Sequence, residues 1–458
     1  MKLPLGKIAE YISATGRCSS GLLAETYSID SRTISPGALF FAVKGERFDG
    51  HDFVEQALAK GAVGAVVRQD RLTHYARQDN LLAVEDTLSA LQTLASAVRK
   101  LWGKPLIGIT GSAGKTTTKE AVAHVLSSKF RVLKSEGNLN NHFGLPLTLL
   151  RLGPEHDAAV IEMGMSHAGE IRALAKIAHP EIGVVTNVAP VHLEFFDSID
   201  GIARAKYELI ESLPSNGTAI LNADDKYVSQ FGRDFAGKVV MYGTGMSATV
   251  RAENIQSLGA AGAKFDVVVG AERQPAVLPL VGEHNILNAL AAVAAGLERG
   301  IKPSQSVAAL STLVPAEKRG QVLHLGNITV INDCYNSNPK ALRAMIDVLA
   351  AMPAKRRIAV AGEMLELGPS GEEMHREAGR YIADKNLELL GVRGLAQFAV
   401  EGAKAAGGRA AFAASAEEAG EWLAREARDG DAVLLKASRG VQLEKALDIW
   451  NARRNGAN

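Results

Sequence analysis

The hydrophobic positions of this chain gather into short apolar runs that alternate with longer amphipathic or alanine-rich stretches. The runs at 106–109, 158–161 and 182–185 contain almost no polar residues, which is typical of strands buried on both faces of a sheet. The stretches at 201–213 and 286–297 have the spacing and length of helices. This alternation of strands and helices predicts a parallel sheet with helices on both faces.

Polar breaks divide this pattern into three parts. Residues 1–83 have the pattern of a small α/β unit, and residues 84–314 hold the long alternation of strands and helices. The charged, proline-containing stretch that follows Val314 marks the second boundary, and residues 315–458 predict another open α/β sheet. We therefore predict three α/β domains. The strands expected in the two outer domains are 38–43, 62–67, 328–331, 358–361 and 432–435.

Composition narrows the class of protein. The 458 residues are 47% hydrophobic, and 51 basic residues nearly balance 50 acidic ones. A net charge of +1 gives no sign of a polyanionic partner, so we expect neither nucleic-acid binding nor attachment to an acidic membrane. Cys18 and Cys334 form no metal-binding pair, and the chain shows neither a signal peptide nor a membrane-spanning apolar run. We expect a cytoplasmic monomer.

The stretch from Pro105 to Phe130 predicts a strand, a glycine-rich phosphate loop and a helix that begins near Lys115. Backbone N–H groups of residues 112–116 would face a polyphosphate at the positive end of this helix, and the Thr116 hydroxyl would be placed for Mg²⁺. The motif is the T-G-[ST]-x-G-K-T variant, because Ile109 stands where the strict pattern has its first glycine. A glycine-rich turn with a solvated lysine is the alternative, but the order of strand, glycines, lysine and threonine favours a nucleotide site. The predicted ATP-binding residues of the loop are Gly111, Ser112, Ala113, Gly114, Lys115, Thr116 and Thr117.

Further candidates follow other strands and helices of the second domain. Glu162 ends the second apolar run, which is where P-loop proteins place the carboxylate that reaches Mg²⁺. His192 follows the third run and reaches the same rim, although a lone histidine is as compatible with a structural role. Lys206 has ordinary amphipathic spacing, so composition alone predicts a surface lysine. Asn285 and Asn288 lie one turn apart and could bind an adenine edge or only cap a helix.

Three polar loops could bind a polar substrate. In the first domain, the loops 28–32 and 44–51 place cationic and polar side chains beside glycines, which suits an anionic nucleotide-sugar, although solvated turns are equally compatible. In the second domain, Asn138 and Asn141 belong to the asparagine-rich loop 135–146, which could hold a substrate or be a cluster of turns. The candidates in the first domain are Ser31, Arg32, Arg47 and His51.

Eight motifs, taken in order along nearly the whole chain, resemble the Mur ligases. Their combination is far more specific than any one motif. YNSNP and GEMLELG favour the member that adds a dipeptide over the one that adds the third amino acid, whose DNPR motif is absent. Folylpolyglutamate synthase shares the phosphate loop but nothing like the DSR and KGERFDGHDF pair. The eight motifs are TGSAGKTTTKE, EMG, NVAPVHLE, GEHNILNALAA, EKRGQ, NDCYNSNP, GEMLELG and LLKASRG.

This resemblance implies a ligase with an N-terminal UDP-sugar domain, a central ATP-binding domain and a C-terminal Rossmann-like domain. The implied reaction joins D-alanyl-D-alanine to a UDP-N-acetylmuramoyl-tripeptide in cytoplasmic peptidoglycan precursor synthesis, and so serves cell-wall growth and division. ATP first phosphorylates the peptide carboxylate, and the dipeptide amine then displaces phosphate from the acyl phosphate. Because the implied site draws on three domains, domain closure would assemble it and exclude water.

The resemblance also assigns roles to individual residues. Lys115, Thr116 and Glu162 would hold the triphosphate and its Mg²⁺, while His192 and Lys206 would hold a second Mg²⁺, with Lys206 as an anionic carbamate. The implied nucleotide contacts outside the loop are Asn285, Asn288, Arg319 and Asp333. The implied substrate contacts are Ser31, Arg32, Arg47, His51, Asn138, Asn141, Tyr335 and Asn336.

Three positions depart from the family pattern: Ala437 replaces a glycine, Ser166 an asparagine and Val191 an alanine. They leave open how the last loop approaches the dipeptide, and the sequence does not decide whether the third acceptor residue is diaminopimelate or lysine. The competing hypotheses are another Mur ligase, folylpolyglutamate synthase, and a P-loop NTPase switch that hydrolyses nucleotide without an acceptor. A non-catalytic carbohydrate-precursor binder is disfavoured by the intact phosphate-loop and carboxylate residues.

Overall fold

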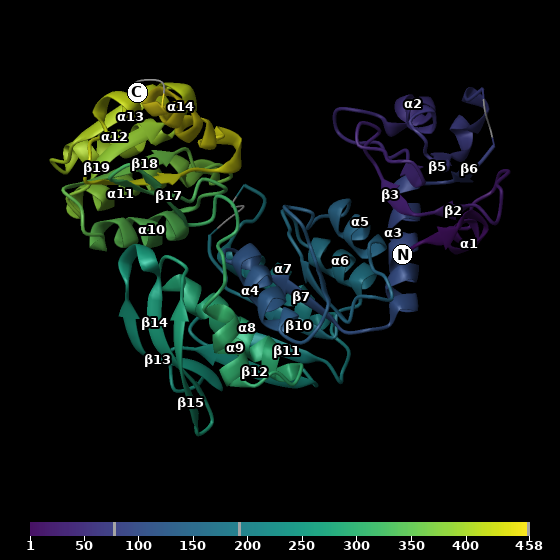
Figure 1. The fold of residues 1–458 in the computed structure, drawn as a ribbon, viewed down its shortest axis with the longest axis horizontal. Coiled ribbons are helices and arrows are strands. Elements are labelled where there is room, and N and C mark those ends of the chain that lie inside the picture. Colours follow the sequence, from purple (N-terminus) through teal and green to yellow (C-terminus); the bar gives the residue numbers. More distant parts are fainter. Residues whose placement is uncertain (77–78, 191–193, 456–458) are drawn as a thin grey trace.

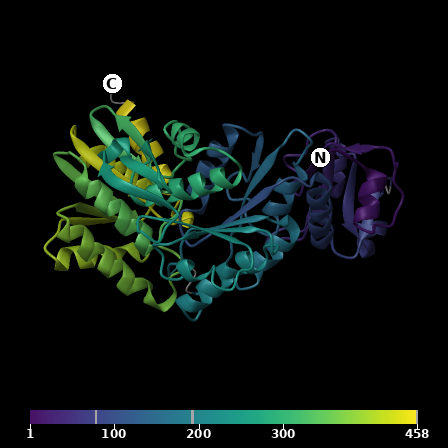
Figure 2. The ribbon, with the colours of Figure 1, turned by 90° about the horizontal axis from the view of Figure 1, so that it is seen from below.

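The computed structural model describes residues 1–76, 79–190 and 194–455, and it places them in three α/β lobes (Figure 1). The N-terminal and C-terminal lobes stand apart on either side of the central lobe. Figure 2 shows the same order from below, with the N-terminal lobe at one end of an elongated molecule. Among the described residues, no helix is both long and apolar enough to cross a membrane.

The N-terminal lobe is built on a four-stranded parallel sheet in the order β3-β4-β5-β6, beside a small antiparallel pair, β1 and β2. Its sheet forms where apolar runs such as Ala38–Phe41 are buried throughout. The elements are β1 (Leu3–Pro4), α1 (Leu5–Tyr11), β2 (Leu23–Ala24), β3 (Thr26–Ser28), β4 (Ala38–Phe41), α2 (Val54–Ala59), β5 (Gly64–Arg68) and β6 (Leu81–Val84).

The central lobe holds a nine-stranded sheet in the order β15-β14-β13-β12-β11-β10-β7-β9-β8. Its strands are β7 (Leu106–Thr110), β8 (Val132–Lys134), β9 (Ala158–Glu162), β10 (Ile182–Val185), β11 (Thr218–Asn222), β12 (Lys238–Gly243), β13 (Val250–Ser257), β14 (Ala263–Val269) and β15 (Glu272–Leu278). Its helices are α3 (Thr87–Trp102), α4 (Lys115–Ser127), α5 (Gly144–Leu150), α6 (Glu170–Ala178), α7 (Ile199–Glu211), α8 (His284–Glu298) and α9 (Pro303–Leu310).

The predicted parallel sheet is confirmed from β8 to β13, but the prediction missed an antiparallel edge. Strands β13, β14 and β15 pair antiparallel, and Gly270, with φ of +58°, begins the two-residue turn between β14 and β15. Along β14, buried and less buried side chains alternate. Such alternation is typical of an antiparallel strand with one solvated face, so a local signal for this edge was present in the sequence.

Two hydrophobic clusters cover the two faces of the central sheet. Leu106 belongs to one cluster and its neighbour Ile107 to the other, as expected when successive side chains of a strand point to opposite faces. Helix α3 contributes Leu91 to the first cluster, which also includes Phe41 of the N-terminal lobe and Leu149 of α5. The N-terminal and central lobes therefore share one continuous core around α3.

The C-terminal lobe has a six-stranded sheet in the order β16-β17-β21-β18-β19-β20, in which only β16 runs antiparallel to its neighbour. The strands are β16 (Gln321–Leu325), β17 (Ile328–Asn332), β18 (Arg356–Gly362), β19 (Glu388–Val392), β20 (Ala410–Ala413) and β21 (Asp431–Lys436). The helices are α10 (Pro339–Ala351), α11 (Gly371–Asp384), α12 (Ala396–Ala405), α13 (Ala416–Glu426) and α14 (Glu444–Asn455). The predicted domain boundaries stay predictions; the first falls near the end of β6 and the second between α9 and β16.

Candidate functional site

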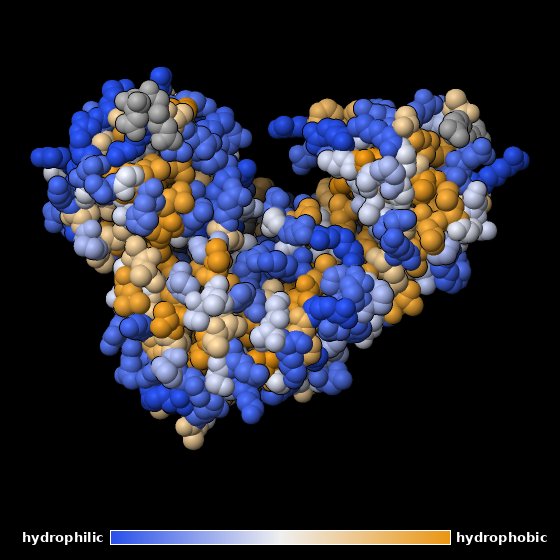
Figure 3. All heavy atoms as spheres, in the orientation of Figure 1, coloured by the Kyte–Doolittle hydropathy of each residue, from blue (hydrophilic) through white to orange (hydrophobic). Residues whose placement is uncertain are grey.

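A cavity of about 660 Å³ lies between the central and C-terminal lobes, at the carboxyl ends of β7 and β9. Figure 3 shows the surface hollowed between the two outer lobes, above the central one. Parallel α/β sheets bind ligands at this edge because the loops that follow adjacent strands converge there. The predicted residues that line the cavity are 112–117, Asn138, Asn141, Glu162, Asn285, Asn288, Arg319, Asp333, Tyr335 and Asn336.

The phosphate loop needs both of its glycines. Gly111 has φ of +149°, and a Cβ there would lie 1.8 Å from Thr186 Oγ1. Gly114 has φ of +80°, and a Cβ there would lie 2.6 Å from Asn288 Oδ1. A side chain at either position would therefore clash with the wall behind the loop, so the backbone reaches this path only with glycine.

Two of the backbone N–H groups of the phosphate loop donate to another loop of the protein. The N–H of Ser112 donates to Asn187 O at 2.9 Å, and that of Ala113 to Asn187 Oδ1 at 3.0 Å. The loop after β10 thus accepts hydrogen bonds from two of the five N–H groups predicted to face a phosphate, and that prediction stays a prediction. Helix α4 begins at Lys115 as predicted, and the first N–H groups of a helix have no intrahelical partner.

Lys115 folds back over its own loop, where its Nζ donates to Gly111 O at 2.8 Å. Burial lowers the pKa of Lys115, the nearby Glu162 carboxylate opposes this shift, and the Arg319 guanidinium adds to it. Lys115 lines the cavity, and an anion bound there would favour the charged form of its amine.

Glu162 presents one free oxygen. Its backbone N–H donates to Ser135 Oγ at 3.0 Å, and Asn140 Nδ2 donates to its Oε1 at 2.8 Å. Among the described residues, Glu162 Oε2 is buried and has no hydrogen-bond partner. An unpartnered buried carboxylate oxygen is costly unless a cation binds it, so this side chain fits a divalent metal ion.

Asn140 was missed by the sequence analysis, which selected its neighbours Asn138 and Asn141 from the same loop. The carboxamide oxygen of Asn141 accepts from the N–H of Gly144 at 2.9 Å and of Phe143 at 3.2 Å, so it caps the start of α5. Only the position of Glu162 in the fold shows which asparagine faces the carboxylate. The asparagine-rich composition of the loop was the available signal.

Asn285 and Asn288 link helix α8 to the phosphate-loop helix. Asn288 Nδ2 donates to Asn285 Oδ1 at 2.9 Å, and Thr118 Oγ1 donates to Asn288 Oδ1 at 3.0 Å. Asn285 Nδ2 also donates to Val281 O. Both asparagines are buried in the cavity wall, where Asn288 joins α8 to α4 and Asn285 holds the Asn288 carboxamide.

The C-terminal lobe supplies the opposite wall of the cavity. The Arg319 guanidinium carbon lies 4.0 Å from the centroid of the Tyr335 ring, and Arg319 Nη2 donates to Thr116 Oγ1 at 3.4 Å. Lys436 Nζ donates to Asp333 Oδ2 at 2.5 Å and to Asn336 O at 3.1 Å. Arg319 thus connects the two lobes across the cavity.

Ala437, which stands where the family pattern has a glycine, affects the packing of the C-terminal lobe. Ala437 follows β21, and a Cβ built on Gly362 would lie 2.5 Å from the Ala437 methyl. The methyl group therefore occupies space beside β18, within the core of the C-terminal lobe, where Ala437 is fully buried.

Lys206 is buried, with 2% of its surface exposed. The surface lysine expected from composition alone is therefore wrong, whereas the carbamate that the family resemblance implies requires this burial and stays a prediction. Lys206 lies on α7 between the buried Ile202 and Leu209, at spacings of four and three residues that place it on the apolar stripe. Burial lowers the pKa of Lys206 well below its ordinary value, and the positive charge of Lys115 lowers it further. This stripe was the signal that sequence reasoning overlooked. His192 and Val191 lie outside the described residues.

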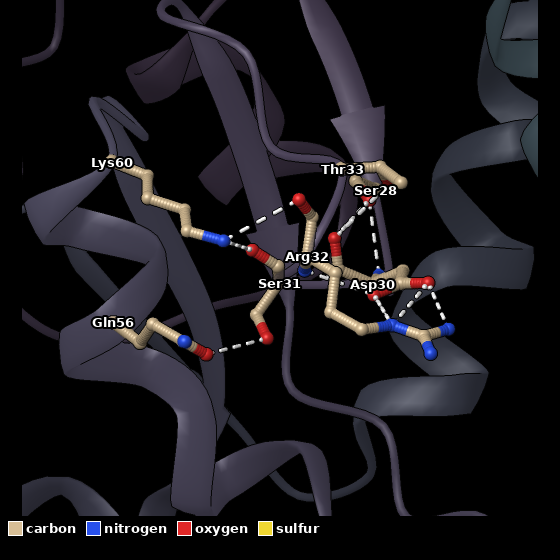
Figure 4. Close-up of polar contacts among 7 residues, drawn as sticks. All are labelled: Ser28, Asp30, Ser31, Arg32, Thr33, Gln56 and Lys60. Carbon is tan, nitrogen blue, oxygen red and sulfur yellow. Dashed lines mark hydrogen bonds and ion pairs between the residues drawn. The ribbon is translucent and has the colours of Figure 1, made fainter.

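The four candidates of the first domain lie in the N-terminal lobe and do not line the cavity. In Figure 4, the Arg32 guanidinium is paired with Asp30, and Ser31 Oγ donates to Gln56 Oε1 at 2.9 Å. The loops that hold the candidates follow β3 and β4, whose carboxyl ends share one sheet edge. Arg47 is exposed there.

The imidazole ring of His51 contacts residues of the N-terminal lobe through both of its nitrogens. Its Nδ1 lies 2.7 Å from Asp49 Oδ1, and its Nε2 accepts from the Arg68 N–H at 3.0 Å. Both ring nitrogens are therefore engaged within the lobe, and the ring is buried. This placement supports a role in holding the 44–51 loop in shape rather than as a free donor.

Comparison with known proteins agrees with this architecture. Three family models match the chain: "Mur ligase family, catalytic domain" at residues 25–99, "Mur ligase middle domain" at 109–296, and "Mur ligase, glutamate ligase domain" at 318–439. The UDP-N-acetylmuramoyl-tripeptide–D-alanyl-D-alanine ligase of Bacillus subtilis is 36% identical over 421 residues, which are 91% of either chain.

Two solved structures share the fold over nearly the whole length. A crystal structure of MurF from Acinetobacter baumannii superposes with a TM-score of 0.89, at 30% identity and with 99% of both chains covered. MurF ligase from Thermotoga maritima in complex with ADP gives a TM-score of 0.84 at 27% identity, covering 95% of this chain and 99% of that one. On this evidence of sequence and fold, the chain belongs to the Mur ligase family.

Proposed function

We propose that this protein joins D-alanyl-D-alanine to a UDP-N-acetylmuramoyl-tripeptide in an ATP-dependent reaction that forms an amide bond. The observation that carries this proposal is the single cavity in which the phosphate loop and Glu162 face polar groups of the C-terminal lobe. The relative from Bacillus subtilis bears the name of this activity, and the chains match over nine-tenths of their length.

ATP is the phosphate donor in this proposal. The N–H groups at the start of α4, the Lys115 ammonium and Arg319 would bind its phosphates, since all of these donors line the cavity and Arg319 reaches Thr116 from the opposite wall. Asn285 and Asn288 would hold the adenine end, and Asp333 the ribose. MurF ligase from Thermotoga maritima was crystallised in complex with ADP, which supports an adenine nucleotide as a ligand.

Thr116 and Glu162 would hold a Mg²⁺ ion. The free Glu162 Oε2 fits this role, and among the described residues no group of three His, Cys, Asp or Glu side chains offers an alternative metal site. When bound, Mg²⁺ neutralises charge on the phosphates as the γ-phosphoryl group moves.

Lys206 would contribute to a second Mg²⁺ site as a carbamate, together with His192. Burial and the charge of Lys115 favour the neutral amine of Lys206, which is the form that attacks CO₂. The amine nitrogen bonds to the carbon of CO₂ and releases one proton, which leaves an anionic oxygen in a pocket that already holds positive charge. This step converts a buried neutral amine into an anionic ligand, which has the sign that a metal ion requires.

In the reaction, the free carboxylate of the tripeptide attacks the γ-phosphorus, and ADP leaves. The Lys115 ammonium would stabilise the negative charge that develops on the transferred phosphoryl group. The dipeptide amine then attacks the carbonyl carbon of the acyl phosphate, loses a proton and expels inorganic phosphate. Tyr335 and Asn336 of the C-terminal lobe would position the dipeptide, and Asn138 with Asn141 the muramoyl peptide.

The UDP-sugar end of the acceptor would bind in the N-terminal lobe. Ser31, Arg32 and Arg47 lie in loops at one sheet edge there, and His51 maintains one of these loops. Because this lobe stands apart from the C-terminal lobe in Figure 1, we propose that the lobes close around the substrates before chemistry.

The protein would act as a cytoplasmic monomer. Cys18 and Cys334 are both free thiols, which agrees with a reducing compartment.

A panel of acceptors and amine donors tests the proposal by measuring phosphate release for each pair. We expect turnover with UDP-muramoyl-tripeptide and D-alanyl-D-alanine, and none with single amino acids or glutamate. Faster turnover of the UDP-dipeptide with diaminopimelate or lysine would identify a different Mur ligase. ATP hydrolysis that proceeds equally without an acceptor would indicate an NTPase.

A further inference from the structure

Lys119 is a buried lysine for which the proposed reaction has no use. It lies on α4, four residues after Lys115, and only 1% of its surface is exposed. A buried ammonium group is costly unless its hydrogen bonds are satisfied, so its partners indicate why it is there. Its carboxylate partner is Glu120, whose Oε1 lies 3.0 Å from Lys119 Nζ.

The second partner of Lys119 leads toward the metal carboxylate. Lys119 Nζ donates to the backbone oxygen of Ser135 at 2.7 Å. The hydroxyl oxygen of the same Ser135 accepts the backbone N–H of Glu162 at 3.0 Å. Ser135 is fully buried, and its own N–H donates to Val160 O at 3.1 Å. Ser135 is thus bonded to Lys119 of α4 through its backbone oxygen, and to Glu162 at the end of β9 through its hydroxyl.

A second connection runs through the loop that Ser135 begins. Five residues later, Asn140 donates from its carboxamide to Glu162 Oε1, and its backbone oxygen accepts the Gly164 N–H at 2.8 Å. The base of this loop is therefore fixed by Lys119, and its far side orients the Glu162 carboxylate. Both connections end on Glu162, which lines the cavity and whose Oε2 has no hydrogen-bond partner among the described residues.

We propose that Lys119 is a positioning residue for the divalent cation, and that it acts through Ser135 to hold Glu162 Oε2 in a geometry that binds Mg²⁺. Groups that orient a metal ligand typically change metal affinity or activity by about 10 to 100-fold when they are removed. Lys119 also ties the loop's position to α4, the helix that carries the phosphate-binding N–H groups. The metal carboxylate and the phosphate site are thereby held as one unit.

This inference rests on the proposed use of Mg-ATP, so the wild-type protein is assayed first with ATP, the UDP-tripeptide and D-alanyl-D-alanine. If the wild type shows no Mg²⁺-dependent turnover, the proposed function fails. If the wild type is active and the variants below bind Mg²⁺ normally, only the role of Lys119 fails.

The test compares Lys119→Met, Ser135→Ala and a matched control, Lys129→Met. Methionine keeps an unbranched side chain but removes the ammonium donor, and Ser135→Ala removes the acceptor for the Glu162 N–H. Lys129 also donates to a backbone oxygen, that of Gly300 at 3.1 Å, but it lies two residues beyond the C-terminal end of α4 and does not line the cavity. The control therefore loses a similar bond without a path to Glu162.

Calorimetry measures the affinity of each full-length protein for ATP with Mg²⁺ and for ATP in a metal chelator. We expect Lys119→Met and Ser135→Ala to weaken Mg-ATP binding about tenfold while metal-free ATP binding stays within about twofold. The Mg²⁺ concentration for half-maximal phosphate release should rise by a similar factor. Lys129→Met should leave both quantities unchanged.

A purely structural role for Lys119 predicts a different result: a lower melting temperature with equal losses of ATP affinity in both buffers. That outcome overturns the proposal. If Lys119→Met does not fold, Ser135→Ala decides the matter, because it retains Lys119 and its bond to the backbone. Wild-type Mg²⁺ dependence in Ser135→Ala would then refute the connection through Ser135.

Discussion

The carboxamide of Asn140 donates to Glu162 Oε1 at 2.8 Å, and the other carboxylate oxygen, Oε2, is left buried with no hydrogen-bond partner among the described residues. A carboxylate that is bonded on one oxygen and open on the other has a fixed orientation and one strong acceptor site. This pair therefore makes the metal hypothesis testable at a residue that does not bind the metal itself.

We predict that Asn140→Ala lowers the ligation rate at limiting Mg²⁺ by about 10 to 100-fold, because the Glu162 side chain loses the group that orients it. Phosphate release measured over a range of Mg²⁺ concentrations checks this. Asn141→Ala is the contrasting variant: it should lower the free energy of unfolding by about 1 kcal/mol through loss of the α5 cap. An unchanged Mg²⁺ requirement in Asn140→Ala would show that Glu162 is held without it.

Lys115→Ala should abolish ligation while leaving the affinity for the UDP-substrate nearly intact. The phosphate loop lies in the central lobe, and the candidates for the UDP-sugar lie in the N-terminal lobe, outside the cavity. Calorimetry with the UDP-tripeptide in the absence of ATP makes the comparison. A lost UDP-substrate affinity would argue against separate domains for the two ligands.

Lys206→Ala should be nearly inactive, and a short-chain carboxylic acid should restore part of its activity by filling the vacated space with an anionic oxygen. Lys206→Arg should not be rescued, because its guanidinium keeps a positive charge and does not form a carbamate. Phosphate release with and without added acid measures the effect. Substantial activity of the alanine variant alone would return Lys206 to a structural role.

Lys206 should also make the free energy of unfolding depend on pH when the protein has no ligand and the buffer contains no bicarbonate. Burial lowers the pKa of Lys206 well below its ordinary value of 10.5, so between these two pKa values the unfolded state binds a proton that the native state does not. The free energy of unfolding of the wild type should therefore rise with pH in this window, by about 1.4 kcal/mol per pH unit from this group. Lys206→Met should be more stable than the wild type at neutral pH, with an advantage that shrinks toward pH 10.5. Urea unfolding of both proteins at several pH values measures this; a constant difference would contradict it.

The outline of the site could be predicted from the sequence because it depends on local pattern. Apolar runs and the glycines at 111 and 114 determine the strand, the loop and the start of α4 within a single stretch of chain. The carboxyl ends of parallel strands meet at one edge, so the position of Glu162 beside Lys115 followed from topology alone. The family motifs added the reaction that this arrangement serves.

The remaining features were decided by contacts between segments far apart in the chain. The pattern of α7 contained the apolar stripe that buries Lys206, but its low pKa also depends on Lys115, which comes from another element. Asn187 takes two N–H groups of the phosphate loop because β10 lies next to β7 in the sheet. Asn140, rather than its neighbours, orients Glu162 because of how its loop crosses the end of β9. Local periodicity specifies which residues form an element and which face is apolar, whereas hydrogen-bond partners and the burial of charge depend on which elements pack together.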